Sequence, residues 1–454
     1  KIYKPNIHFM TITLNKALGY LSFLFLGFLL LFNRPFVGIY ILNIQIGKYL
    51  IATSVLLSGL ALLFFILKKD FYSPLKIENL LKVFFLSNLV FLIGLFIHNT
   101  NVMSSYTFKS SSYIWTLGYL FFAFFVFKDF EVNKNFQMFF LYSFMTVPFI
   151  HYIFSTGYFP NVIINFFNSY SDKFEFTKAS DIMLSLIIAN LLNLKLSNNN
   201  FYKILYFTFS VSFLLPLLLF MSRGSFVSGV LFFLLVIFYY RKYFISKLSY
   251  TLFFVFISLS SALISLSNVS DIDFSISFNN DEPTVVDAVQ SVSKKNETRK
   301  AFLSLYIQDG RLMSKDNTTN WRLDIWQDVF EDMDKKNLLF SGYGHNAIIP
   351  VMTDPSAPGR LGRDGLNENV HNYFVTIFAR GGLFQFILFI IFYITLLRMW
   401  KSKYRSYSIV IFLIPVLFNS TLDMSMEGVQ YPLVFYLFLG YLFQSEQKCK
   451  ICNF

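Results

Sequence analysis

The sequence contains few charged residues for its length. Only 14% of its 454 residues are charged, whereas a soluble globular domain has about 25%. So little charge cannot coat a water-soluble body of this size, which excludes a soluble enzyme, a nucleic-acid-binding domain and a disordered chain. Apolar residues make up 55% of the chain and aromatic residues 20%. This composition is typical of a protein that spans a membrane.

Cysteine is almost absent. The two cysteines, Cys449 and Cys452, both lie at the C-terminal end of the sequence, so a disulfide framework is excluded. Their spacing is that of a redox or zinc half-site. Because no second pair lies nearby, an unpaired, reduced tail is the simpler interpretation.

Motifs that bind nucleotides or metals are also missing. The sequence has no Walker loop, Rossmann fingerprint, zinc-protease motif or nucleophile elbow. It has no Asp-x-Asp in a short outer turn next to a span, where a metal-dependent sugar transferase holds its ion. We therefore expect no cofactor, and the energy for any reaction has to arrive with the substrate.

Long apolar runs dominate the rest of the sequence. Runs of about 17–20 apolar residues are enough to cross a hydrocarbon core of roughly 30 Å. Length and periodicity predict an all-α polytopic membrane protein with about twelve helices. The expected spans cover residues 14–33, 49–67, 80–97, 111–127, 136–154, 179–194, 204–220, 226–240, 250–267, 371–397, 406–421 and 430–443.

The basic residues orient these helices. With the N-terminus inside, the inner segments hold far more lysine and arginine than the short outer segments, which is the positive-inside pattern. Both termini are then cytoplasmic, and the net charge of +12 needs no nucleic-acid partner. We expect three parts: helices over residues 1–267, a large outer loop over 268–370, and helices with a cytoplasmic tail over 371–454.

The first part of the outer loop changes character along its length. Residues 268–300 are polar and predict a flexible segment, and residues 301–308 predict a short apolar helix. Residues 320–335 have the pattern of an amphipathic helix. Thr319 or Asn320 is expected to cap the start of that helix. Its expected apolar face consists of Trp326, Val329, Phe330 and Met333.

Residues 341–370 complete the outer loop and are rich in glycine and proline. Such a composition predicts either an ordered irregular loop or a mobile cover over a site. In both cases the segment is expected to border the functional face of the protein.

Arg223 is the first candidate site residue, in a very short outer turn between two apolar spans. A guanidinium offers a rigid fork of donors that matches phosphate oxygens. The alternative is an anchor that only marks the membrane interface. The small neighbours Gly224 and Ser225 favour a functional role, because they allow close approach and hydroxyl donation.

Arg322 is the second candidate. Its spacing from Trp326, Val329 and Met333 places it on the apolar face of the expected helix 320–335. A charge on a buried face has to be paired. Its partner is either a carboxylate of the protein or an anionic ligand, and we favour the ligand.

His371 is the third candidate and lies where the outer loop enters the tenth span. A neutral imidazole near the working pH is the usual general base, although a histidine at a membrane interface is more often a polar anchor. Helical spacing brings Gly382 under His371, which predicts a groove for a lipid chain or another helix. Arg380 points the opposite way and is expected to be structural.

Three acidic residues near the outer face are less informative. Asp423 and Glu427 share one outer turn, and a helix cap and a solvated charge explain them as well as a catalytic role does. Asp181 begins the sixth span, where we favour an N-terminal helix charge over a functional acid.

Taken in order, four stretches resemble the bacterial O-antigen ligase family and the O-antigen and exopolysaccharide polymerases that share its C-terminal signature. They are Ser222-Arg223-Gly224, Trp321-Arg322 with Trp326, Gly342 with Gly344, and His371-Asn372 followed by Gly382. The large outer loop before the tenth span also matches. Gln385 stands where the ligase motif has Gly, Thr or Tyr.

The resemblance implies a metal-independent, inverting glycosyltransferase of the membrane-embedded C type in the bacterial inner membrane. It would move a glycan from undecaprenyl diphosphate to an acceptor hydroxyl on lipid A-core, at the periplasmic face. Arg223 and Arg322 would bind the diphosphate and His371 would take or orient the hydroxyl proton. The expected substrate-binding or supporting residues are Ser222, Asn372, Tyr373, Trp326, Gly344 and Gly382.

Three other functions remain open at this point. A polymerase would transfer the same donor to another lipid-linked glycan, and a protein O-oligosaccharyltransferase would transfer it to a protein. A flippase for lipid-linked glycan would not be an enzyme. It predicts charges along a central cavity within the spans, whereas here the spans hold few charges.

Overall fold

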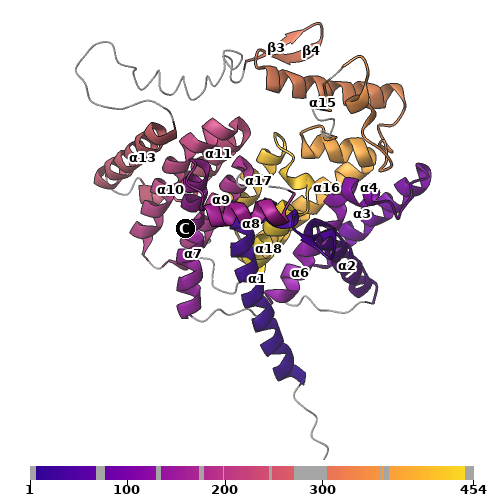
Figure 1. Cartoon of the computed structure of the whole chain (residues 1–454). Coiled ribbons are helices and arrows are strands. Elements are labelled where there is room, and N and C mark those ends of the chain that lie inside the picture. The colour runs from indigo at the N-terminus through magenta and orange to yellow at the C-terminus, as the bar shows by residue number, and fades with distance from the viewer. Residues whose placement is uncertain are drawn as a thin grey trace, which may run out of the picture.

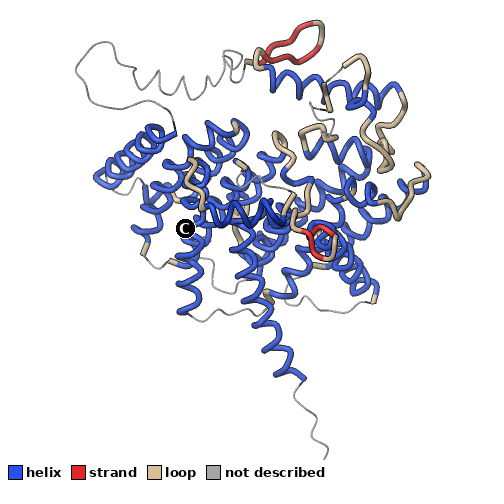
Figure 2. Tube along the Cα trace, in the orientation of Figure 1, coloured by secondary structure: helices blue, strands red, loops and turns tan. Residues whose placement is uncertain are grey.

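The protein is a bundle of long helices with a smaller layer on one side (Figure 1). The computed structural model describes residues 7–67, 77–128, 134–172, 178–197, 199–244, 248–269, 304–357, 359–361 and 368–444. Within these ranges nearly all regular structure is helical, and the strands form two short hairpins (Figure 2). Cys449, Cys452 and most of the expected flexible segment 268–300 lie outside the described residues.

Each expected span coincides with a helix or, in one case, a pair of helices. They are α1 (Ile7–Val37), α2 (Ile46–Ile66), α3 (Glu78–Ile97), α5 (Ser112–Trp115) with α6 (Gly118–Val126), α7 (Lys134–Ser155), α9 (Ala179–Leu196), α10 (Asn200–Met221), α11 (Arg223–Tyr239), α13 (Leu248–Val269), α16 (Tyr373–Tyr404), α17 (Val410–Ser420) and α18 (Gln430–Gln444). Among the described residues, eight helices are long and apolar enough to cross a membrane. The chain is therefore a multi-pass membrane protein, and the count of twelve spans stays a prediction.

The short elements connect these helices. They are β1 (Tyr40–Ile41), β2 (Ile44–Gln45), α4 (Ser105–Ser110), α8 (Asn161–Tyr170), α12 (Arg241–Phe244) and the 3-10 helix η3 (Ser425–Glu427). Of these, η3 matters most for function, because it lies in the turn between α17 and α18.

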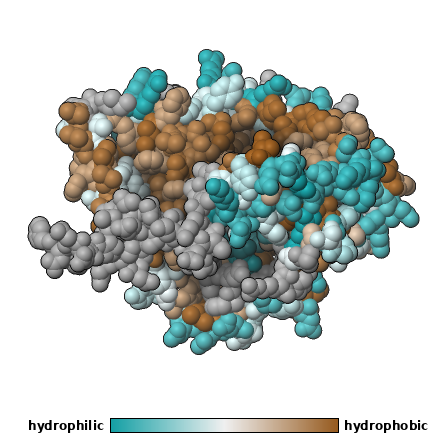
Figure 3. Space-filling model, turned by 90° about the horizontal axis from the view of Figure 1, so that it is seen from above, coloured by the Kyte–Doolittle hydropathy of each residue, from teal (hydrophilic) through white to brown (hydrophobic). Residues whose placement is uncertain are grey.

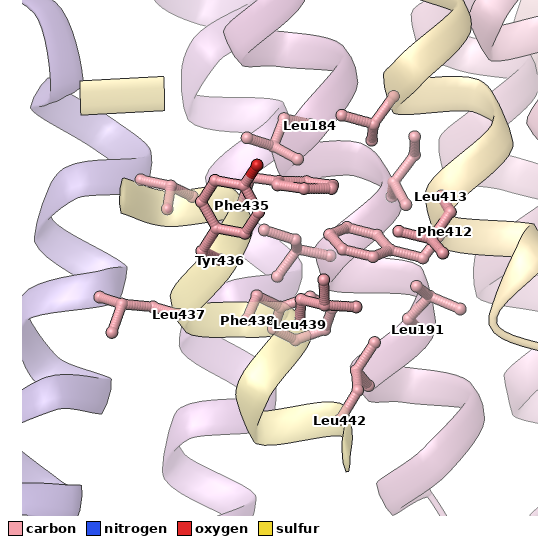
Figure 4. Close-up of a cluster of buried hydrophobic side chains, with 14 of the residues drawn as sticks. Leu184, Leu191, Phe412, Leu413, Phe435, Tyr436, Leu437, Phe438, Leu439 and Leu442 are labelled. Atoms are coloured by element: carbon pink, nitrogen blue, oxygen red, sulfur yellow. The ribbon is translucent and has the colours of Figure 1, made fainter. Parts of the chain in front are cut away.

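Helices α9 and α18 form the centre of the bundle. Every residue of α18 from Tyr431 to Gln444 is buried, and α18 packs against Leu184 and Leu191 of α9 and Phe412 of α17 (Figure 4). The rings of Phe412 and Phe435 stack at 5.1 Å. Lipid is as apolar as these side chains, so close packing rather than removal from water holds the helices together.

The outer layer begins with a hairpin where we expected a helix. Residues 301–308 were predicted to be helical, but β3 (Leu305–Gln308) pairs antiparallel with β4 (Arg311–Ser314). Asp309 and Gly310 both have positive φ, at 51° and 76°. An Asp-Gly pair is a favoured two-residue hairpin turn, and this local signal overrides the apolar pattern.

Helix α15 (Asn317–Lys335) follows the hairpin and confirms the predicted amphipathic helix. Its N-cap is Asp316, not Thr319 or Asn320 as predicted, and the Asp316 carboxylate accepts from the backbone N–H of Thr319 at 2.9 Å. Val329 and Met333 are buried as expected. Phe330 is 46% exposed, contrary to the prediction, and its ring contacts Phe378 at 5.0 Å.

Two arginines bind the charged side of α15, Arg360 from the irregular loop and Arg311 from the hairpin. Arg360 is only 3% exposed and binds both Asp324 and Asp328, and Arg311 of β4 binds Asp328 at 2.6 Å. Arg360 also donates to the carbonyl of Val351 in the 3-10 helix η2 (Pro350–Thr353). These ion pairs make the described part of 341–361 an ordered loop.

The outer layer has a hydrophilic side. Seen from above, hydrophilic side chains gather on the right of the face, the side on which α15 lies in Figure 1, and hydrophobic side chains form a broad band behind them (Figure 3). The polar surface of this face thus lies where α15 and its neighbours do.

Candidate functional site

Four segments far apart in the sequence meet at the start of α15, on the side that faces the bundle. They are the N-terminus of α11, the first two turns of α15, the residues that lead into α16, and the turn that contains η3. An ion pair joins Arg223 to Asp316, an edge-to-face ring contact joins Trp321 to His371, and Asp423 acts electrostatically on both Arg322 and His371. The structure therefore brings the three predicted residues into one cluster.

Arg223 is the first residue of α11, and Ser222 alone separates α10 from α11. Its Nη1 lies 2.8 Å from Oδ1 of Asp316. The small neighbours of Arg223 have internal partners, which corrects the role suggested for them. A Cβ on Gly224 would lie 2.9 Å from Leu422, and Ser225 donates to Asn419 at 3.0 Å.

Arg322 lies one turn into α15 and is half-buried. Burial lowers the pKa of its guanidinium, and the carboxylates of Asp423 and Asp316 oppose that shift. Its Nε is buried and has no hydrogen-bond partner in the part of the chain that the structure describes. Asp324 and Asp328 of the same helix bind other arginines, whereas the carboxylates that act on Arg322 are Asp423 and Asp316 of the cluster.

His371 has φ of +55°, a backbone conformation that non-glycine residues seldom adopt. Such conformations occur at functional sites, where the surrounding structure holds them in place. Burial, and then the charge of Arg322, lower the pKa of His371 from 6.5 to about 4, while Asp423 acts in the opposite direction. The imidazole is therefore neutral at pH 7.

Asn372 and Trp326 hold the chain around His371. The side-chain oxygen of Asn372 caps α16 by accepting from Phe374 and Val375, and the indole N–H of Trp326 donates to the carbonyl of Val370 at 2.7 Å. Both residues were predicted to bind or support the substrate, and these bonds give them a positioning role.

Tyr373 turns into the helix bundle. It is 1% exposed and its ring packs on Phe389 at 5.5 Å. Tyr373 therefore packs in the core of the bundle and not at the position beside the substrate that we predicted.

Gly382 does not leave a groove beneath His371, so that prediction is wrong. Helix α16 begins only after His371 and is interrupted at Gly382, which has φ of +67°. A Cβ there would collide with the carbonyl of Phe340, and the N–H of Leu383 donates to Leu339 at 2.8 Å. The segment before Gly342 thus fills the space that we had assigned to a lipid chain.

Gly344 belongs to the same crossing of the loop over α16. It has φ of +76°, and a Cβ would lie 2.7 Å from His98. Its N–H donates to the carbonyl of Arg380, and Arg380 in turn donates to carbonyls of the loop and to Tyr106 at 2.9 Å. Arg380 is structural as expected, and Gly344 provides close backbone packing.

Two acidic residues of the turn before α18 complete the cluster. The negative charge of Asp423 favours the protonated forms of Arg322 and His371. Glu427 is not a solvated charge: its Oε1 accepts from Thr376 at 2.8 Å. Burial raises the pKa of Glu427 from 4.5 to about 7, so this carboxyl titrates near neutral pH.

Asp316 is the site residue that sequence reasoning missed, although an Asp three residues before Thr319 is a typical N-cap and was a detectable signal. Asp423 was named but not selected, because only the folded chain brings it close enough to act on Arg322 and His371. Asp181, the acidic residue at the start of the sixth expected span, accepts a hydrogen bond from the side-chain amide of Asn33 at 3.2 Å. Within the described ranges, no group of three or more His, Cys, Asp or Glu side chains is arranged to hold a metal.

Comparison with protein families finds a match in the second half of the bundle and the outer layer. Residues 208–390 match the family model described as O-antigen ligase, a segment that runs from α10 into α16 and contains Arg223, Arg322 and His371. No curated protein matches the sequence. The match confirms the resemblance stated above.

Proposed function

We propose that this chain, a protein of the O-antigen ligase and polymerase superfamily, moves a glycan from undecaprenyl diphosphate to an acceptor hydroxyl. In this proposal the cluster beneath α15 faces the periplasm, both termini are cytoplasmic, and the fold is of the membrane-embedded C type. The excess of lysine and arginine in the opposite segments supports this orientation.

The reaction is an inverting substitution at the anomeric carbon of the donor. The bond from this carbon to the diphosphate oxygen breaks, and the acceptor oxygen forms the new glycosidic bond from the opposite side. Negative charge develops on the leaving diphosphate. Arg223 and Arg322 stabilise that charge through charge-assisted hydrogen bonds, the role that a metal ion has in other transferases.

His371 receives the proton of the acceptor hydroxyl. Its lowered pKa keeps it neutral but also makes it a weak base while the positive charge of Arg322 is uncompensated. A bound diphosphate neutralises Arg322 and thereby raises the pKa of His371. The base thus gains strength only when the donor is in place, and Asp423 stabilises the imidazolium that forms.

One observation carries the proposal most directly. Arg322 is half-buried, its Nε has no hydrogen-bond partner among the described residues, and it lies beside a neutral histidine. A buried charge needs a partner, and the nearest carboxylates act on Arg322 only through space. A diphosphate supplies the missing anion.

Transfer by the purified protein in liposomes tests the proposal. We expect transfer to persist in EDTA and to be lost in His371→Ala, with expression and membrane insertion unchanged. Arg322→Lys should lower the rate nearly as much, because an ammonium group loses the bidentate geometry. Arg311→Lys is the matched control, since Arg311 lies beside the same helix but binds Asp324 and Asp328. Full activity of Arg322→Lys or His371→Ala contradicts the assigned roles.

The acceptor decides between ligase and polymerase. We propose a ligase that uses lipid A-core. In a deletion strain, loss of all surface glycan with retention of lipid-linked polymer supports the ligase. Core capped by a single repeat indicates a polymerase instead, and an unchanged lipopolysaccharide pattern with unglycosylated protein indicates a protein O-oligosaccharyltransferase.

A further inference from the structure

Asp316 presents one carboxylate to both arginines of the site. Its Oδ1 lies 2.8 Å from Nη1 of Arg223, and its charge also favours the protonated form of Arg322. Its other oxygen, Oδ2, accepts from the backbone N–H of Thr319 at 2.9 Å and from its hydroxyl at 2.6 Å. The Asp316 side chain is only 4% exposed. An anion of the protein therefore contacts one guanidinium of the site and acts electrostatically on the other.

The two oxygens of this carboxylate have different tasks. Oδ2 caps α15, as an N-cap aspartate does, and this bond does not depend on Arg223. Oδ1 contacts Arg223 and takes no part in the cap. Asp316 can therefore lose its contact with Arg223 and still keep α15 capped.

We propose that Asp316 is an internal anion that holds Arg223 in position until the diphosphate of the donor replaces it. The inference rests on the proposed function. A partly buried guanidinium without a counter-ion is costly, so the pair keeps Arg223 directed at the site when the donor is absent. A diphosphate carries more charge than a carboxylate and offers several acceptor oxygens, so it displaces Oδ1.

This arrangement makes Asp316 a positioning residue that competes with the donor. Every binding event has to break the contact between Arg223 and Asp316. Removing the charge of Asp316 should therefore strengthen donor binding, whereas removing a residue that only supports the fold should weaken it or leave it unchanged. The sign of the effect separates the two roles.

Binding of undecaprenyl diphosphate to the purified full chain in detergent tests the inference. Asp316→Asn retains a side-chain oxygen that caps α15, because asparagine is as good an N-cap as aspartate. We expect its Kd to fall about tenfold, which corresponds to ~1.4 kcal/mol. Asp354→Asn is the matched control, since Asp354 also accepts from a backbone N–H, that of Ser356, and its Kd should not change. If Asp316→Asn is unstable, Asp316→Ser, which also caps, replaces it.

A second background shows whether Asp316 acts through Arg223. In Arg223→Gln, the additional change Asp316→Asn should lower the Kd by at most about threefold, because the contact with Arg223 no longer exists and only the through-space effect of Asp316 on Arg322 remains. A tenfold gain in that background contradicts the inference, since it indicates direct repulsion of the phosphate. An unchanged or higher Kd of Asp316→Asn in the otherwise wild-type chain also contradicts it. If the wild-type chain does not bind undecaprenyl diphosphate at all, the proposed function fails instead.

Discussion

The protonation of His371 gives the sharpest prediction about the site without donor. A pKa of about 4 instead of 6.5 corresponds to roughly 3 kcal/mol in favour of the neutral imidazole. Burial is the larger cause and the charge of Arg322 the second. At pH 5.5 His371 should be only ~3% protonated, whereas an ordinary histidine is ~90% protonated at this pH.

The change Arg322→Gln separates these two causes. It removes the charge but leaves the burial, so the pKa of His371 should rise above 4 without reaching 6.5. Titration of histidine-labelled protein by NMR in detergent measures both values, with His371→Gln to assign the signal. A wild-type pKa near 6.5, or no rise in Arg322→Gln, refutes the reasoning.

The same shift has a consequence for stability. The pKa of His371 is lower in the folded than in the unfolded chain, so protonation opposes folding. The contribution of His371 to stability should therefore fall as the pH drops from 6.5 towards 4. In thermal unfolding, His371→Gln should gain stability relative to the wild-type chain as the pH drops over this range.

Two further predictions concern residues around the site. Gly382→Ala should lower the melting temperature by several degrees, because Gly382 has a positive φ and an added Cβ would collide with the carbonyl of Phe340. Gly94→Ala is the control, since nothing lies within 4 Å of a Cβ at that position. Equal effects of the two changes contradict the packing described. Glu427 has a raised pKa of about 7, so its contribution to stability should fall as the pH rises from 4.5 through 7, because the buried carboxyl becomes charged. Relative to the wild-type chain, Glu427→Gln should therefore gain stability as the pH rises over this range, and a difference that does not change with pH contradicts the assignment.

Much of the bundle could be predicted from the sequence. Twelve apolar segments are long and continuous, and every one of them is helical. Helix α15 was also predictable, since Val329 and Met333 recur at helical spacing and are buried. In both cases the signal is local and repeated, which makes it robust.

The errors have a common physical cause. The hairpin at Asp309 and Gly310, the break at Gly382 and the cap at Asp316 each depend on one or two residues within a longer pattern. At Gly382 the helical spacing continues on both sides, so only the contact with Phe340 reveals the interruption. The periodicity of apolar residues does not reveal features that depend on such single positions.

The site itself was predictable in part. Arg223, Arg322 and His371 were named from their chemistry and from the family resemblance, and the structure brings them together. The carboxylates were harder to predict: Asp316 was not considered and Asp423 was named but not selected, because both meet the arginines only through tertiary contacts. They make the resting site a partly compensated cluster of charges.

A structure of the full chain with bound undecaprenyl diphosphate would show whether the two arginines hold the donor. We expect phosphate oxygens within about 3 Å of the guanidinium nitrogens of Arg223 and Arg322, Asp316 withdrawn from Arg223, and His371 on the side from which an acceptor hydroxyl approaches. A diphosphate bound elsewhere, with the ion pair between Arg223 and Asp316 intact, would contradict the claim.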